Sequence, residues 1–142
     1  MRLAGRVFKS GKYWAIEVPI LGVVTQGRTK KDAFEMISDA IETLVNKTGF
    51  ELHIFPGKSS YLEVGSSDAA TLTAFLLRRQ RMKQGLTLVE VSKRLGAKSH
   101  TTYARYEQGK SVPTIEKLNQ LLAAVSPGRD FVLAESQENS RR

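Results

Sequence analysis

Side chains suited to reading another molecule gather in one stretch of the chain, residues 98–114. Hydroxyl, imidazole and guanidinium groups can hydrogen-bond to DNA base edges, whereas lysines, hydroxyls and helix amide ends hold phosphates. The residues that we expect to face base edges are His100, Thr101, Thr102 and Arg105. Those that we expect to face phosphates are Lys98, Lys110, Ser111 and the helix start at Thr114, and the capping residues Thr87 and Ser99 complete the predicted DNA-binding set.

Two short helices must position these side chains. Gly85 ends one helix, and Thr87 with Glu90 three residues later has the spacing of a capping box. An apolar stripe follows and Gly96 breaks it; its members are Leu88, Val91 and Leu95. Ser99 can cap a second helix, residues 100–108, which Gly109 closes and whose core side chains are Tyr103 and Tyr106. This layout predicts a helix-turn-helix that lays its second helix in the major groove.

The stretch also resembles the Xre/Cro-type repressor helix-turn-helix. The matching residues are Arg81, Thr87, Val91, Gly96, Glu107, Gly109 and Pro113. Leu88 stands where that family usually has Gln, and the interval from Gly96 to Glu107 is one residue longer than usual. The resemblance implies that Arg81 and Glu107 form a largely buried ion pair that braces the recognition helix. A bundle used only for protein contacts is the alternative.

The basic residues are concentrated in the same part of the chain as the predicted helix-turn-helix. The chain of 142 residues carries a net charge of +8, and residues 78–117 hold ten Lys or Arg against three Asp or Glu. A basic excess on the proposed reader is what phosphate neutralisation requires. There are no cysteines and only two histidines, so we expect no metal site and no cofactor. No apolar run approaches the ~20 residues of a membrane span and the start lacks the apolar core of a signal peptide, so we expect a soluble, cytoplasmic protein.

The first half of the chain reads as a small sheet with one helix. Strands are predicted at residues 2–9, 13–18, 22–26 and 50–55, with one more short strand possible at 61–64. Thr29 should cap a helix that Gly49 stops. Its apolar stripe is Ala33, Phe34, Ile37, Ala40, Ile41, Leu44 and Val45. We therefore predict an α+β protein with a β-β-β-α-β domain at residues 1–64.

The second half reads as helices. Residues 65–68 have the composition of a flexible linker, and residues 69–126 form the predicted helix-turn-helix domain. Its closing helix should turn Ile115, Leu118, Leu121, Leu122 and Val125 inward. Residues 127–142 are predicted to be a partly disordered tail, and its apolar island 131–133 could pair as a strand or dock on a neighbour.

With both halves considered, the chain resembles a HicB-type antitoxin. The N-terminal matches are Tyr13, Trp14, Pro19, Gly22, Thr25, Gly27, Thr29, Ala33 and Ala40, with Asp32 in place of the usual Glu. The resemblance implies a partial RNase H-like fold, a HicA-like toxin that cleaves mRNA as partner, and repression of the protein's own operon. It does not imply an enzyme. The hairpin strands offer Glu17 alone, which is too few carboxylates for a two-metal nuclease.

Several points remain open at the level of sequence. We name Tyr13, Trp14, Glu35 and Asp39 as candidate toxin contacts, although Trp14 could equally be core. The acidic residues of the predicted helix in residues 1–64, which include Glu35 and Asp39, are more simply explained as a face exposed to solvent than as a binding surface. A stand-alone repressor with a small-molecule-sensing or dimerising N-terminal domain is the alternative function. In either case we expect a homodimer or a higher homo-oligomer on operator DNA, because a single helix-turn-helix reads few base pairs.

Overall fold

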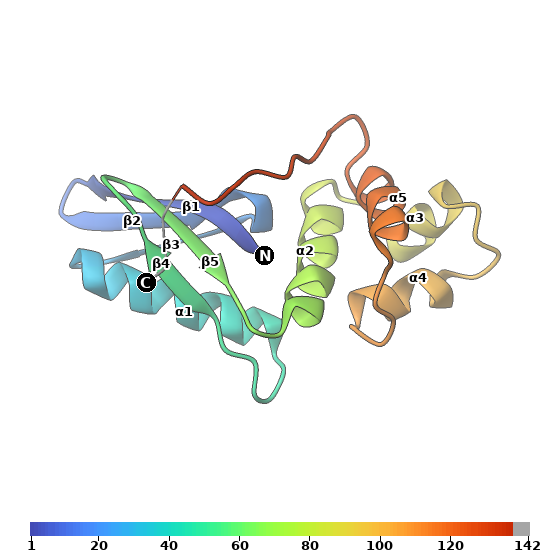
Figure 1. Cartoon of the computed structure of the whole chain (residues 1–142), viewed down its shortest axis with the longest axis horizontal. Coiled ribbons are helices and arrows are strands. Elements are labelled where there is room, and N and C mark those ends of the chain that lie inside the picture. Colours follow the sequence, from blue (N-terminus) through green and yellow to red (C-terminus); the bar gives the residue numbers. More distant parts are fainter. Residues whose placement is uncertain (138–142) are drawn as a thin grey trace. The chain divides into compact units, whose positions relative to one another are not determined.

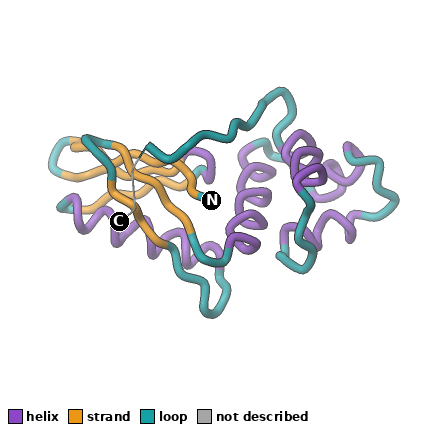
Figure 2. Tube along the Cα trace, viewed as in Figure 1, coloured by secondary structure: helices purple, strands orange, loops and turns teal. Residues whose placement is uncertain are grey.

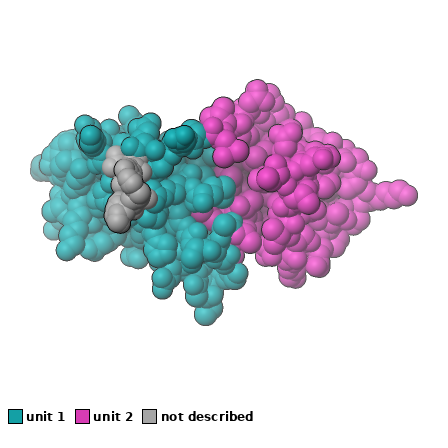
Figure 3. Space-filling model, viewed as in Figure 1, with its two compact units in different colours: residues 1–69, 134–142 teal, residues 70–133 magenta. Residues whose placement is uncertain are grey.

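The computed structural model describes residues 1–137. The chain divides into two compact units (Figure 3). Unit 1 contains Met1–Ala69 together with the described residues from Ala134 onward, and unit 2 contains Ala70–Leu133. The protein is therefore a mixed α+β protein with its sheet in unit 1 and its helix-turn-helix in unit 2.

Unit 1 is built on a five-stranded antiparallel sheet (Figures 1 and 2). Its strands are β1 (Arg2–Ser10), β2 (Tyr13–Val18), β3 (Val23–Gly27), β4 (His53–Pro56) and β5 (Tyr61–Gly65). They are ordered β3-β2-β1-β5-β4, so β1 lies in the centre. A 3₁₀ turn, Pro19–Leu21, follows β2, because a proline has no N–H to continue the ladder of strand hydrogen bonds.

One helix, α1 (Lys30–Val45), covers one face of this sheet (Figure 1). Thr29 caps it by accepting a hydrogen bond from the Asp32 amide at 3.0 Å. Ala33, Ile37 and Ile41 are its fully buried residues. They meet the inward-facing side chains of the strands, which include Leu3, Val7, Ile16, Val18, Leu62 and Val64. The central residues of the predicted apolar stripe thus form part of the core of unit 1, whereas Leu44, which was also predicted to lie in the stripe, is 39% exposed near the end of the helix.

The approach between β3 and α1 depends on a glycine. A Cβ on Gly27 would lie 2.4 Å from the Ala33 amide nitrogen and 2.7 Å from the Asp32 carbonyl carbon. Both neighbours are backbone, so no side-chain movement could make room. Gly27 is therefore required by the close packing of the strand end against the first turn of the helix.

Three predictions for unit 1 were wrong in detail. The helix ends at Val45 with Asn46 in the left-handed conformation, before Gly49 is reached. The strand predicted at 50–55 is displaced to β4, because the Leu52 amide donates to the Glu42 side chain at 2.8 Å and not to a ladder partner. The topology is β-β-β-α-β-β, not the predicted β-β-β-α-β, since β5 is a full strand paired on both sides.

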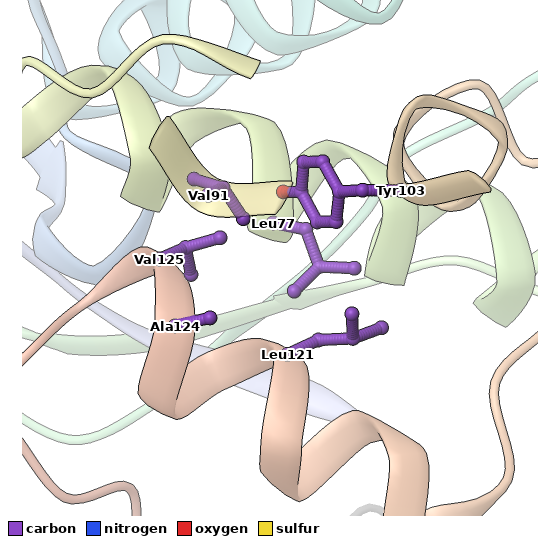
Figure 4. Packing of buried hydrophobic residues seen from close by; sticks show 6 residues of the cluster. All are labelled: Leu77, Val91, Tyr103, Leu121, Ala124 and Val125. Atoms are coloured by element: carbon purple, nitrogen blue, oxygen red, sulfur yellow. The ribbon is translucent and has the colours of Figure 1, made fainter. Parts of the chain in front are cut away.

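Unit 2 is built from four helices: α2 (Ala69–Lys83), whose first residue is still assigned to unit 1, α3 (Leu88–Arg94), α4 (His100–Glu107) and α5 (Ile115–Val125). Its core brings together one set of side chains from all four helices, shown in Figure 4: Leu77, Val91, Tyr103, Leu121, Ala124 and Val125. Partly buried leucines and Tyr106 pack around this cluster. The first residue of α5 departs from the prediction. Ile115 is 88% exposed, because it is the first residue of α5 and the core reaches only as far as Leu118, one turn later in the helix.

The predicted linker belongs to unit 1, whereas the predicted tail is divided, with residues 127–133 in unit 2 and its described residues from Ala134 onward in unit 1. Gly65 is the last residue of β5, and Asp68 pairs with Lys47 at 2.9 Å. The apolar island forms no strand, and Val132 and Leu133 are fully exposed to solvent. Part of the predicted disorder, residues 138–142, lies outside the described residues. Within residues 1–137, none of the helices combines the length and apolar character needed to cross a bilayer.

Candidate nucleic-acid interface

The first helix of the reading motif, α3, is fixed at both ends. The Glu90 amide donates to the Thr87 hydroxyl at 3.1 Å, and the Thr87 amide donates to the Glu90 carboxylate at 2.9 Å. This is the predicted capping box, and the hydrogen bond from the Thr87 amide lowers the pKa of Glu90. At the other end Gly96 adopts φ +71° and the Ala97 amide returns to the Ser92 carbonyl at 2.9 Å. The turn toward α4 is thereby defined by backbone hydrogen bonds.

The second helix, α4, presents two distinct faces. Ser99 caps it by accepting from the Thr101 amide at 3.2 Å, and Gly109 follows its end with φ +72°. Tyr103 is buried, and Tyr106 packs half-buried on the same core. The four residues predicted to face base edges are all exposed: His100, Thr101, Thr102 and Arg105. The helix therefore offers imidazole, hydroxyl and guanidinium groups on the side away from the core.

An ion pair braces this helix against α2. The Arg81 guanidinium donates to both oxygens of Glu107, through Nε at 2.7 Å and Nη2 at 3.0 Å, and to the Leu86 carbonyl at 2.9 Å. The side chains are only 16% and 6% exposed. Tyr103 also donates its hydroxyl to Glu107. The pair expected from the sequence is thus present as a bidentate, largely buried contact.

The pKa shifts in this cluster follow from the same contacts. The hydrogen bond to Glu107 raises the pKa of Arg81. Burial, followed by the hydrogen bond to Glu107, raises the pKa of Tyr103 far above its ordinary value. Both residues therefore keep their protons at physiological pH, and both continue to donate to the same carboxylate.

The residues predicted to hold phosphates lie around the ends of α3, α4 and α5. Lys98 and Lys110 are exposed, and Ser111 is half-buried. Thr114 caps α5 by accepting from the Lys117 amide at 3.1 Å, as Thr87 and Ser99 do for their helices. In each cap the hydroxyl oxygen accepts, so its hydrogen is still available to donate. Such capped helix starts are suited to phosphate oxygens.

The candidate toxin contacts in unit 1 are not gathered into one surface. Tyr13 and Trp14 are successive residues of β2, so they point to opposite faces of the sheet. Trp14 is half-buried, with the ammonium groups of Lys9 and Lys30 lying 5.6 and 5.9 Å from its ring. By contrast, Glu35 and Asp39 lie one turn apart and share a shallow hollow whose other lining residues are Phe34, Ser38 and Ile54.

One functional candidate escaped the sequence reasoning. Glu63, in the middle of β5, is a buried carboxylate that is only 3% exposed. Burial would raise its pKa, but hydrogen bonds from Ser136, Tyr61, Arg2 and the Gln137 amide outweigh burial and lower that pKa below the ordinary value. The alternation Leu62, Glu63, Val64 indicated a solvent-facing side chain. No local signal showed that Ser136 and Gln137, 73 and 74 positions later, would cover it.

The sheet nevertheless does not assemble a metal site in its described part. Glu17 and Glu63 both lie on the face opposite α1, where their β1 partners are Arg6 and Ala4. Glu17 is paired with Arg6 at 3.2 Å, and Glu63 with Arg2 at 3.1 Å. Across residues 1–137 no group of three His, Cys, Asp or Glu side chains could hold a metal ion.

Unit 2 has the fold and exposed face of a helix-turn-helix DNA-binding domain. In agreement, the helix-turn-helix family model matches residues 77–125, which form an Xre/Cro-like helix-turn-helix domain. This match covers the end of α2 and all of α3, α4 and α5. The comparison with curated proteins gives no match.

Proposed function

We propose that the chain is an antitoxin that represses its own operon through unit 2 and neutralises a HicA-like, mRNA-cleaving toxin through unit 1. The observation that supports DNA reading best is α4, a braced helix whose exposed face carries only base-reading side chains. The ten basic residues within 78–117 supply the phosphate attraction. Acting on operator DNA, the protein would work in the cytoplasm.

The toxin-binding role of unit 1 is supported by the resemblance to HicB-type antitoxins and by the hollow on α1. Glu35 and Asp39 place two carboxylates beside the apolar Phe34 and Ile54. Such a hollow suits the stem and cation of a lysine or arginine, which are common on the surface of an RNA-binding enzyme. We assign unit 1, as a partial RNase H-like domain, the role of covering the toxin without performing chemistry.

Assembly as a dimer completes the proposal. Two recognition helices about 34 Å apart would match half-sites one DNA turn apart. Unit 2 exposes Ile115, Val132 and Leu133, which are 88%, 88% and 103% exposed. Burying these side chains against a second copy would remove apolar surface from water. Light scattering of the full chain at working concentration measures the oligomeric state. A strictly monomeric species with unchanged operator affinity would contradict the proposed dimer.

The DNA-binding half can be tested by separating base readers from phosphate contacts. Arg105→Ala should cost about 1–3 kcal/mol of operator binding, mainly at one base pair, if its guanidinium reads a guanine. Lys110→Ala should weaken all sequences alike and lower the salt slope by about one. Lys31→Ala, an exposed lysine of unit 1, is the control. Equal losses on every sequence for Arg105→Ala would make it a phosphate contact.

The toxin-binding half requires its own experiment. The full chain is co-expressed with a HicA-like neighbour, and the hollow is reversed in charge by Glu35→Lys and Asp39→Lys. Toxin binding and rescue of growth should be lost while operator binding is kept. Glu51→Lys, an exposed acid outside the hollow, is the matched control. If the hollow variants still neutralise the toxin, this surface is not the contact; if the wild-type chain fails to bind it, the antitoxin assignment fails.

A further inference from the structure

The face of the sheet opposite α1 carries a carboxylate that no element of the sheet covers. Along β5 the side chains alternate, so Leu62 and Val64 face α1 and Glu63 faces away from it. A glutamate on such a face is normally solvated. Glu63 is only 3% exposed because the chain segment beginning at Ala134 lies over it.

The hydrogen bonds of Glu63 divide evenly between the sheet and this segment. From the sheet, Arg2 Nη1 donates to Oε1 at 3.1 Å and the Tyr61 hydroxyl donates to Oε2 at 2.6 Å. From the segment, the Ser136 hydroxyl donates to Oε1 and the Gln137 amide donates to Oε2 at 3.2 Å. The carboxylate is thus oriented by its own sheet and holds the segment by one bond to each oxygen.

The sheet side of this arrangement is itself fixed. The Arg2 guanidinium stacks 3.5 Å from the centre of the Phe55 ring on β4, and Arg2 Nη1 also donates to the Ser136 hydroxyl at 3.4 Å. Arg2 belongs to β1 and Phe55 to β4, so both stand on strands rather than on loops. A rigid aromatic and a guanidinium therefore hold the receiving carboxylate ready for a ligand.

We propose that Glu63 anchors a docking site for an extended chain segment, and that residues 134–137 occupy this site as an intramolecular ligand. The chemistry defines what fits. The ligand offers a hydroxyl side chain and, from the next residue, a backbone N–H, both donated to one carboxylate. Ser or Thr followed by any residue other than proline satisfies this, because proline lacks the amide hydrogen.

Docking has a consequence for the DNA-binding unit. Unit 2 is the chain between Ala69 and Ala134, and both of those residues belong to unit 1. The docked segment therefore closes unit 2 into a loop with both ends attached. A protein that binds this face of the sheet with the same chemistry must displace the segment and thereby release one end of the loop.

Hydrogen exchange on the full chain tests the docking. The Gln137 amide should be protected in the wild type, and Ser136→Ala should accelerate its exchange roughly ten-fold or more, because a hydrogen bond to a charged group is lost. Ser67→Ala, an exposed serine outside this site, is the matched control and should change nothing. Fluorescence melting of Trp14, the single tryptophan, shows that unit 1 stays folded in each variant.

A second measurement uses a ligand in trans. In Gln137→Pro the internal segment loses one of its two hydrogen bonds to Glu63, so it competes less strongly for the site, while no residue of the sheet is changed. A synthetic peptide of residues 131–142 should then bind this variant saturably and bind the wild type at least ten-fold more weakly. A Gln137 amide that exchanges in the wild type as fast as in an unstructured peptide, or equal peptide binding to both proteins, overturns the proposal.

Discussion

Removal of one partner from the Arg81–Glu107 pair is the most informative perturbation of unit 2. Glu107→Gln keeps the shape of the side chain but removes the negative charge of the carboxylate to which Arg81 and Tyr103 donate hydrogen bonds. Arg81 is 16% exposed, so its guanidinium would stay largely desolvated without a counter-ion. A buried charge that loses its partner is the costly case, whereas replacing both partners by apolar groups is often neutral.

The size of the effect follows from this burial. Breaking a buried pair costs about 3–5 kcal/mol of unfolding free energy. A domain of 60–100 residues loses about 4–8 °C per kcal/mol, so the melting temperature of unit 2 should fall by roughly 12 °C or more. The double variant Arg81→Met with Glu107→Leu should recover most of that loss. The exposed pair Arg6–Glu17, with side chains 58% and 30% exposed, is the control, and Glu17→Gln should cost under about 1 kcal/mol.

The two units can be followed separately in one sample. Trp14, the only tryptophan, belongs to unit 1, so its fluorescence reports that unit alone. Far-ultraviolet circular dichroism also reports the unfolding of the helices of unit 2. Glu107→Gln should lower the midpoint temperature of the transition followed by ellipticity and leave the midpoint temperature of the transition followed by tryptophan fluorescence unchanged. A loss below about 1 kcal/mol, or a double variant no more stable than Glu107→Gln, would refute the reasoning, because the pair would then not carry a desolvated charge.

Three further predictions concern single sites. Gly27→Ala should destabilise unit 1 by several kcal/mol, because its Cβ would lie 2.4 Å from the Ala33 nitrogen, and tryptophan-detected denaturation measures this. Ser126→Ala should leave unit 2 unchanged or stabilise it by up to about 1 kcal/mol, since the buried Ser126 hydroxyl has no hydrogen-bond partner among the described residues; the ellipticity transition measures this. Hydrogen bonds hold the folded-state pKa of Glu63 below its ordinary 4.5, so the stability it contributes is present above pH 4.5 and lost as pH falls through the folded-state pKa. The stability difference between wild type and Glu63→Gln, measured by urea unfolding, should therefore shrink in acid, and a constant difference would contradict this.

The sequence predicted best those features that depend on neighbouring residues. The capping box at Thr87, the caps at Thr29 and Ser99 and the turn at Gly96 are each set within a few positions. The strand β2 was predicted with its observed bounds, because its aromatic and β-branched residues end at a proline. Burial of Tyr103 followed from helical periodicity in the same way.

Features that depend on distant parts of the chain were missed. The strand β4 was displaced because Glu42, ten residues away, takes the Leu52 amide. Ile115 fits the apolar period of α5, but the core ends before it, and periodicity does not report how far a core extends. Glu63 was overlooked since its cover comes from Ser136 and Gln137, whose placement only the folded chain determines.

The central position of β1 has a consequence for synthesis on the ribosome. β1 can pair with β2 as soon as the hairpin emerges, but its other edge must wait for β5, which is made after β3, α1 and β4. During that interval the strand that will be the centre of the sheet is an exposed edge with unpaired N–H and C=O groups. Exposed edges of this kind recruit other strands. The nascent chain therefore passes through a stage in which the unpaired edge of β1 is open to pairing with other chains, and this stage ends only when β5 has been made.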